Sequence, residues 1–415
     1  MSAGSAPRAW PAGLAALRER NFVLYVIGLI TSQLGQWIEV TAVSWILYEM
    51  TSSPLLLGLN GLFRAAPFIL LGLVGGVVAD RIPRRAMLML TESTMLVMSL
   101  AIGLLAATDN LQFWHLYLLS LVSGTVAAFS GPARHALMAG LVPREALQSA
   151  VTLHVIALRS GMLVGPAIGG LMLAYGGYAL PFLVNAASFV GMILALRAMR
   201  LSAAPTEAAP PARTGMLLSV QEGVRFVWRS PALKAALALE IMTGLFGYNS
   251  TLVTIFSRDI LAAGPQGLGL LFSALGAGGL LGMGAMLAVR VQRHARVILM
   301  FGVVYVALWS AFGLSKSLWL TAAVLFLLGA VDSMWSVTRS TMAQMLVPDG
   351  LRGRVMSVVM LATRGSGQLG HVQSGVAVSL LGGPAATLAG AGIIALGVIV
   401  SARMLGKRGD QVAGG

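Results

Sequence analysis

Six ionisable side chains lie inside long apolar stretches of the sequence, and they are its best candidates for chemistry. They are Glu39, Arg64, Arg159, Glu240, Asp332 and Arg364. A charge at the centre of a bilayer costs about 2.5–3.5 kcal/mol on insertion scales, so such residues indicate ion pairing or proton transfer. His154 and His371 are isolated histidines without a spacing motif, and we interpret them as packing or hydrogen-bonding residues.

The depth of these residues predicts two ion pairs. Glu39 lies about ten residues before the end of one apolar stretch and Arg64 about ten after the start of the next, so both sit roughly 15 Å from the same surface. We expect them to pair, either as a permanent structural pair or with Glu39 as a proton acceptor that exchanges partners. Asp332 and Arg364 form the second predicted pair. Glu240 and Arg159 are unpaired in this scheme, and either lines a cavity or they reach each other across it.

The composition identifies the elements that carry these charges. The 415 residues are 57% hydrophobic and only 10% charged, whereas a soluble domain has about a quarter charged residues. This excludes a water-soluble globule and a disordered chain. A membrane-spanning helix needs about 20 apolar residues. We predict twelve such helices, over residues 22–49, 54–79, 86–107, 113–138, 148–175, 178–199, 233–256, 267–289, 297–314, 318–342, 355–381 and 385–404.

The positive charges predict the orientation of the chain. Most of the 28 Lys and Arg residues, Arg134 and Arg339 among them, fall in the terminal segments and in loops after even-numbered spans, while loops after odd-numbered spans hold only Arg258 and Lys316. By the positive-inside rule both termini face the cytoplasm, as in a multi-pass protein of the bacterial inner membrane. The net charge of +14 is therefore explained without nucleic acid as a partner. The first 21 residues lack the apolar region of a cleaved signal peptide.

A linker divides the chain into two similar halves. Residues 201–215 are rich in Pro and Ala, and apolar residues at helical spacing then predict a short amphipathic helix on the membrane surface. The triplet Leu-Val-Pro at 141–143 recurs at 346–348, which indicates an internal repeat. The predicted organisation is a cytoplasmic tail (1–21), a six-helix bundle (22–200), a linker with the amphipathic helix (201–232), a second six-helix bundle (233–404) and a cytoplasmic tail (405–415).

One loop resembles a signature of a known superfamily. The segment from Gly76 to Arg85, GVVADRIPRR, is similar to the G-x-x-x-D-R-x-G-R-[RK] motif of the major facilitator superfamily, with Pro83 in place of the usual glycine. The resemblance implies an all-α membrane fold of two six-helix bundles related by a pseudo-twofold axis. It also implies a conformational latch, in which a carboxylate among arginines docks against a helix N-terminus. The latch residues would be Gly76, Asp80, Arg81, Arg84 and Arg85.

A second motif resembles that of exporters in the same superfamily. Residues Gly161, Gly165, Pro166, Gly169 and Gly170 match the antiporter motif G-x(3)-G-P-x(2)-G-G. Three of the glycines form one smooth helix face, which we expect to pack against Gly278 and Gly282 between the halves. Stretches such as Gly131-Pro132-Ala133-Arg134 are similar to the bacterial branch with enterobactin exporters, transmembrane secretion effectors and macrolide efflux proteins. Ser120 stands where drug–proton antiporters often carry an arginine, which argues against proton coupling through that span.

These patterns predict a secondary active transporter that exports a small amphiphilic molecule, drug-like or siderophore-like, in exchange for protons. The alternative is an importer or facilitator of a small solute with the same fold. The expected cavity residues are Trp37, Tyr248, Asn249 and Trp335, because binding pockets combine aromatic walls with a few polar groups. The sequence contains no H-E-x-x-H, G-x-S-x-G or Walker A motif, which argues against a metalloprotease, a serine hydrolase and an ATP-driven pump. We therefore expect no enzyme, no metal and no cofactor. The expected partners are the substrate, protons and the lipid bilayer, and we expect the protein to be a monomer.

Overall fold

The computed structural model describes residues 12–79, 82–200, 216–288 and 294–406 of the 415-residue chain. Every regular element in this part is a helix. The first half contains η1 (Ala12–Arg18), α1 (Arg20–Thr51), α2 (Pro54–Ala79), α3 (Arg84–Ala107), α4 (Phe113–Gly140), η2 (Arg144–Ala146), α5 (Leu147–Gly176) and α6 (Ala179–Ala198). The second half contains α7 (Met216–Arg229), α8 (Pro231–Phe246), α9 (Ser250–Ile255), the π-helical η3 (Phe256–Ile260), α10 (Gly264–Ala288), α11 (His294–Leu314), α12 (Leu318–Leu346), α13 (Asp349–Leu381) and α14 (Gly383–Gly406).

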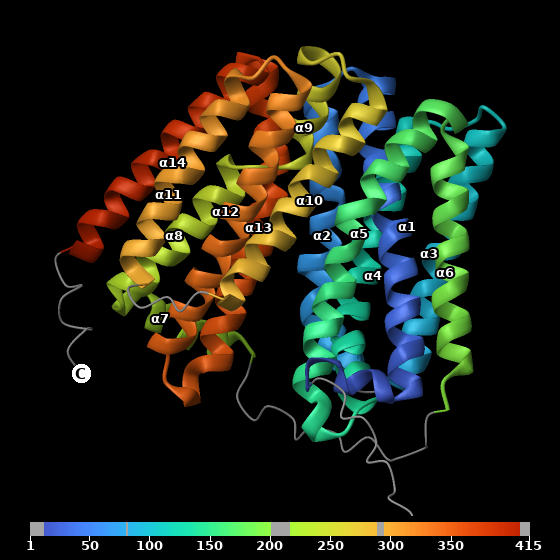
Figure 1. Ribbon diagram of the computed structural model, residues 1–415, viewed down its shortest axis with the longest axis horizontal. Coiled ribbons are helices and arrows are strands. Elements are labelled where there is room, and N and C mark those ends of the chain that lie inside the picture. The colour runs from blue at the N-terminus through green and yellow to red at the C-terminus, as the bar shows by residue number, and fades with distance from the viewer. Residues whose placement is uncertain (1–11, 80–81, 201–215, 289–293, 407–415) are drawn as a thin grey trace, which may run out of the picture.

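The helices form two bundles that lie side by side (Figure 1). One bundle contains α1 to α6 and the other α8 to α14. We call the end where α1 begins and α6 ends the linker face, and the end where α1 finishes beside η3 the turn face. The bundles lie close together at the turn face, and their helices diverge toward the linker face (Figure 1).

Ten helices in the described part of the chain are long and apolar enough to cross a membrane. This confirms the predicted all-α membrane fold, because only internally hydrogen-bonded helices of this kind satisfy their backbone in lipid. Two predicted spans do not meet the length and hydropathy limits. The segment 233–256 is divided between the short helices α8 and α9, and α13 is long but rich in polar residues. The count of twelve spans therefore stays a prediction.

The break between α8 and α9 is held by side chains of α11. Gly247 has an extended backbone, and Asn249 caps α9 by accepting a hydrogen bond from the Leu252 amide. Around the break, the Tyr305 hydroxyl accepts from the Tyr248 amide at 2.9 Å, and the Trp309 indole donates to a backbone carbonyl at 3.2 Å. Side chains thus satisfy backbone groups that a continuous helix would have paired internally.

Two glycine-lined seams join the bundles. In the first, between α5 and α10, an added Cβ at Gly269 would lie 3.2 Å from the Cα of Gly170, and Gly276 backs onto the Met162 backbone. In the second, between α2 and α13, a Cβ at Gly58 would lie 3.1 Å from the Cα of Gly375. At the Gly170–Gly269 and Gly58–Gly375 contacts the helix backbones come together because neither partner has a side chain there.

The prediction that the antiporter motif packs against Gly278 and Gly282 was wrong. Gly161, Gly165 and Gly169 do form one face, but this face packs against α1 of the same bundle, on Trp37 and its neighbours. Gly278 and Gly282 pack against α12. Of the motif, Gly170 and the Pro166 carbonyl contribute to the seam between the bundles. Sequence spacing defined the smooth face correctly but not the helix that covers it.

Replacing Gly269 with leucine should destabilise the protein by about 1–3 kcal/mol, the usual cost of forcing atoms into a packed contact. The new side chain would meet the backbone of Pro166 and Ala167, which cannot move aside as a flexible side chain can. The thermal unfolding midpoint of the detergent-purified protein measures the effect. Gly284→Leu is the control on the same helix, since a Cβ there meets nothing within 4 Å. Equal midpoints in both variants would contradict the close packing of this seam.

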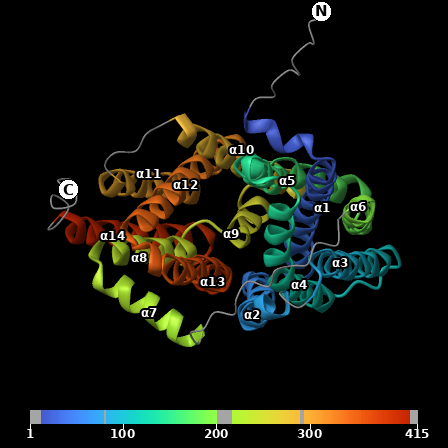
Figure 2. The same ribbon diagram turned by 90° about the horizontal axis from the view of Figure 1, so that it is seen from below.

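Helix α7 lies along the outside of the second bundle, next to α8 and α13 (Figure 2). Val227 is buried in a small apolar cluster with residues of α8, α12 and α13. The Trp228 side chain on the other side is 69% exposed, and Glu222 forms an ion pair with Arg354 of α13. An apolar face against the protein and a polar outer face are typical of a surface helix, and the predicted place of this helix at the membrane surface stays a prediction.

Candidate functional site

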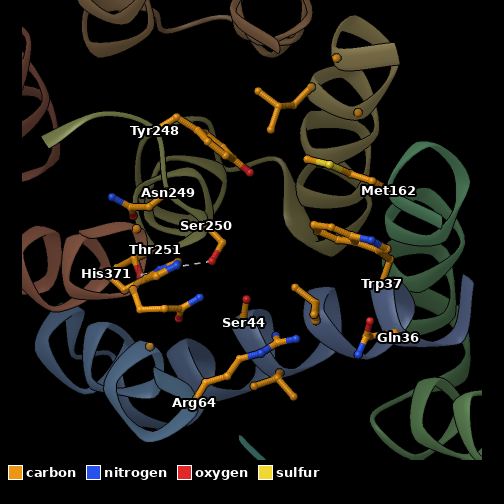
Figure 3. A pocket seen from close by; sticks show the side chains of 18 of the residues that line it. Gln36, Trp37, Ser44, Arg64, Met162, Tyr248, Asn249, Ser250, Thr251 and His371 are labelled. Carbon is orange, nitrogen blue, oxygen red and sulfur yellow. Dashed lines mark hydrogen bonds between the residues drawn. The ribbon is translucent and has the colours of Figure 1, made fainter. Parts of the chain in front are cut away.

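A central cavity of about 600 Å³ lies between the two bundles (Figure 3). Helices α1, α2, α4 and α5 line it from one side, and α9, α10, α12, α13 and the α8–α9 break line it from the other. Its charged lining residues are Glu39, Arg64, Arg159 and Asp332. Among the described residues, the cavity thus holds two carboxylates and two guanidiniums, so its formal charge is balanced.

Glu39 is bound by neutral donors instead of by Arg64. The Ser99 hydroxyl donates to the Glu39 carboxylate at 2.7 Å, the Asn185 amide also donates to it, and all three side chains are buried. Within the described side chains no ion pair joins Glu39 to Arg64, and Figure 3 shows Arg64 extending into the open part of the cavity. The predicted pair is therefore not formed in this conformation. The shared depth was right, but depth alone does not say which helix face a residue occupies.

The second predicted pair is also not formed. Asp332 lines the central cavity with Arg159, whereas the Arg364 guanidinium lies over the Phe68 ring of α2, 5.1 Å from its centroid. Glu240 does not reach across to Arg159. Its carboxylate lies 2.8 Å from the Nε of Arg339 on α12.

Two arginines assigned to loops lie within helices instead, Arg134 half-buried and Arg339 buried. Arg134 of α4 pairs with Glu92 of α3 at 2.6 Å, and Arg339 pairs with Glu240. Both arginines fall within the predicted spans 113–138 and 318–342, so the span limits already contained the signal that their loop assignment missed. Each pair places a guanidinium between helices of one bundle.

Three of the four expected cavity residues line the cavity. Trp37 and Tyr248 supply aromatic walls and Asn249 supplies polar groups (Figure 3). Trp335 does not line it, because its ring is fully buried inside the second bundle against Tyr305, with the Arg339 guanidinium 4.3 Å from the ring centroid. His371 lines the cavity with its Nδ1 3.0 Å from the Thr251 hydroxyl.

The structure describes only part of the predicted latch. Gly76 lies near the end of α2, whereas Asp80 and Arg81 are outside the described residues. The Arg84 guanidinium donates to the Ala136 carbonyl in α4 at 3.0 Å, and Arg85 donates to the Arg197 carbonyl in α6 at 3.0 Å. Both guanidiniums thus contact the C-terminal parts of other helices, α4 and α6, where the helix dipole favours positive charge. The latch itself stays a prediction.

A contact that the sequence did not predict closes the turn face. We call Tyr48, Ser52, Arg258 and Asp259 the clamp. Arg258 of η3 donates to the Tyr48 carbonyl at 2.8 Å and lies over the Tyr48 ring at 5.0 Å, and the Tyr48 hydroxyl donates to Asp259. Arg258 also approaches the Ser52 hydroxyl. The clamp joins the last turn of α1 to the opposite bundle, directly above the cavity. Its only sequence signal was the position of Arg258 in a loop with few cations.

A comparison with protein families identifies the chain. Residues 11–413 match the model of the transmembrane secretion effectors, a family of the major facilitator superfamily. The chain belongs to this family. It is a membrane transporter and not an enzyme, and the predicted fold is confirmed.

Curated relatives and solved structures agree with this assignment. The chain is 27% identical to the multidrug efflux pump Tap of Mycolicibacterium fortuitum over 85% of this chain and 88% of that protein. It is 28% identical to the enterobactin exporter EntS of Shigella boydii over 74% and 73% of the two chains. The nucleoside transporter NupG (TM-score 0.71, 12% identity, 93% and 99% covered) and a D-xylose–proton symporter (0.70, 14%, 92% and 96%) share the fold. The family implies small-molecule substrates and a place in the cell membrane as a multi-pass protein.

Proposed function

We propose that this transporter exports a small amphiphilic molecule from the cytoplasm by alternating access and that inward proton flow drives it. The observation that carries the proposal is the central cavity, which lies between two bundles that are clamped at the turn face and diverge at the linker face. Such a state receives substrate from the linker face. The excess of Lys and Arg predicted for the loops at that face supports a cytoplasmic location for it, and the similarity to Tap and EntS supports export.

The lining of the cavity fits an amphiphile. Trp37, Met162 and Tyr248 offer apolar surface, while charged groups of both signs and the Asn249 amide offer hydrogen bonds. A pocket of this kind binds bulky molecules through aromatic contact and orients them by a few polar groups. Glu39 and Asp332 are carboxylates inside membrane helices, where each can gain or lose a proton as the cavity changes its exposure.

Flux into proteoliposomes tests the proposal. The protein is reconstituted with an acidic lumen, and uptake of an anionic amphiphilic dye such as 8-anilinonaphthalene-1-sulfonate is followed by fluorescence. We expect the dye to accumulate in the acidic lumen in exchange for protons, and a protonophore should abolish the accumulation. A rate of dye flux that does not depend on the pH gradient would identify a facilitator. Accumulation of the dye on the alkaline side would identify a symporter that imports its solute. Both results would overturn proton-driven export.

Glu39→Gln should uncouple transport from the pH gradient. The glutamine keeps an oxygen that accepts from Ser99 and Asn185, but it cannot exchange a proton. We expect gradient-driven accumulation to fall about tenfold or more, as for loss of a proton-transfer group, while downhill dye exchange continues. Ser44→Ala is the control, since Ser44 lines the same cavity without an ionisable group. Full accumulation with intact pH dependence in Glu39→Gln would reject the proton role of this carboxylate.

A further inference from the structure

A second cavity, which we call the side cavity, is lined by helices of the second bundle. It has a volume of about 360 Å³, is lined by α7, α8, α12 and α13, and is open on the side of the exposed residues Met360 and Arg364. Its polar lining residues are Glu240, Ser336, Arg339, Ser340, Thr363 and Arg364. The remaining lining residues are apolar. The proposed export through the central cavity does not account for this side cavity.

Arg339 has donors that no protein group uses. Its side chain is 5% exposed, its Nε faces Glu240 and its guanidinium lies over the Trp335 ring, 4.3 Å from the centroid. Within the described part of the chain, its buried Nη1 makes no hydrogen bond. A guanidinium carries five N–H donors, and a buried donor without an acceptor is unfavourable. A buried, unpaired N–H on the wall of a cavity indicates that the cavity binds an acceptor.

The side cavity has an excess of positive charge. The lining contains Arg339, the exposed Arg364, whose guanidinium also lies over Phe68, and one carboxylate, Glu240. The described lining therefore carries one net positive charge, unlike the balanced central cavity. The hydroxyls of its lining residues add further donors. Planar guanidiniums match the paired oxygens of carboxylates and phosphates. The acceptor that this lining fits is therefore an oxyanion.

The apolar wall lies nearer the linker face than the charges do. On α8, Leu233 and Leu237 precede Glu240, and on α13 Met356 and Met360 precede Arg364, with both helices starting at the linker face. A ligand that fits this gradient has its acidic group inward and its hydrocarbon part toward the linker face. A membrane phospholipid would have the opposite orientation, with its headgroup at the surface.

Two helix faces carry lining residues of both the side cavity and the central cavity. Asp332, Ser336 and Arg339 are spaced i, i+4, i+7 on α12, which places them on one face. Asp332 belongs to the central cavity and the other two to the side cavity. Residues Arg364, Gln368 and His371 repeat the same spacing on α13. An anion released by Arg339 would meet Arg159 as the next cation of the central cavity.

We propose that the side cavity binds the carboxylate or phosphate of an amphiphilic substrate before the substrate enters the central cavity. Arg339 and Arg364 bind the acidic group, and Leu237 and Met356 contact the hydrocarbon part. The assignment rests on the proposed export function and adds to it that the substrate is an amphiphilic acid.

Binding of radiolabelled octyl phosphate to the detergent-purified full chain tests this assignment by scintillation proximity. We expect saturable binding that unlabelled octyl phosphate abolishes. Inorganic phosphate should compete at least tenfold more weakly because it lacks the chain, and octyltrimethylammonium should not compete because its charge has the wrong sign. Dihexanoyl phosphatidylglycerol should also compete weakly.

Two variants and one control locate the site. Arg364→Gln should weaken binding about tenfold, and Arg339→Lys should weaken it as well, since lysine keeps the charge beside Glu240 but lacks the planar fork. Arg197→Gln removes an exposed guanidinium at the end of α6 and should change nothing. If Arg339→Lys does not yield folded protein, Arg364→Gln decides alone.

Several results would overturn the assignment. Unchanged affinity in Arg364→Gln would show that octyl phosphate binds elsewhere. Equal competition by octyltrimethylammonium would reject selectivity for acids, equal competition by inorganic phosphate would reject an amphiphile, and tighter binding of the phosphatidylglycerol would assign the cavity to lipid. The assay needs no transport, so loss of proton-driven dye flux with intact, Arg364-dependent binding would reject the proposed export and leave the anion site standing.

Discussion

Replacing Arg258 with alanine should open the turn face and expose the central cavity at that end, which the proposed orientation places outside the cell. Arg258 donates to the Tyr48 carbonyl, stacks on the Tyr48 ring and approaches Ser52, and all of these contacts cross between the bundles. Hydrogen bonds of charged groups contribute about 1.5–3 kcal/mol. Because every 1.4 kcal/mol changes an equilibrium tenfold, we expect the population open at the turn face to rise about tenfold or more.

The chain has no cysteine, so a single introduced thiol reports this change without background. Ser44→Cys places the thiol on the wall of the central cavity, and a membrane-impermeant maleimide is added to intact cells. The labelling rate should rise with Arg258→Ala and rise less with Tyr48→Phe, which removes only the hydrogen bond to Asp259. Lys316→Ala is the matched control, because it removes an exposed cation from the turn between α11 and α12 on the same face. A labelling rate that Arg258→Ala leaves unchanged would show that the clamp does not hold the turn face closed.

Removing either partner of the Glu92–Arg134 pair should be the most destabilising change in the first bundle. Both groups lie between α3 and α4, Glu92 is 2% exposed, and Ser32 also donates to its carboxylate. A buried charge left without its partner costs about 3–5 kcal/mol. We therefore expect Arg134→Leu and Glu92→Leu each to reduce the yield of folded protein strongly and to lower its thermal unfolding midpoint.

The double variant separates the pair from its surroundings. Glu92→Leu combined with Arg134→Leu leaves no unpaired charge, and replacing a buried ion pair by apolar residues is often neutral. Its unfolding midpoint should return most of the way to that of the unaltered protein, which a double-mutant cycle measures directly. If the two single losses simply added in the double variant, the two side chains would not be coupled in the folded protein.

Hydropathy and charge were sufficient to predict the helices and the fold, because lipid leaves the backbone few alternatives. Ten spans, the glycine face of α5 and the α7 helix all follow from periodic patterns of side chains. These patterns are local, and they do not depend on how one helix is rotated against another.

The contacts within the site depend on that rotation and could not be predicted. Ser99 and Asn185 reach Glu39 from two other helices, and nothing in their own surroundings distinguishes them from other small polar residues. The clamp joins Tyr48 to a residue 210 positions further along the chain. Arg364 lines the side cavity instead of meeting Asp332, because of how α13 is rotated about its axis. Trp335 is likewise buried inside the second bundle because of the rotation of α12. The depth of a residue in the membrane follows from its position along one helix. Its contact partner depends on how two helices are rotated relative to each other.

The two glycine-lined seams have a mechanical consequence for how the bundles move. They lie on either side of the central cavity, and each consists mainly of backbone surfaces, at Gly170 and Gly269 in one case and at Gly58 and Gly375 in the other. Smooth surfaces without interlocking side chains can pivot with few rotamer changes. In the proposed alternating-access cycle, the two seams can therefore serve as pivots, whereas the polar contacts of the clamp must break for the turn face to open.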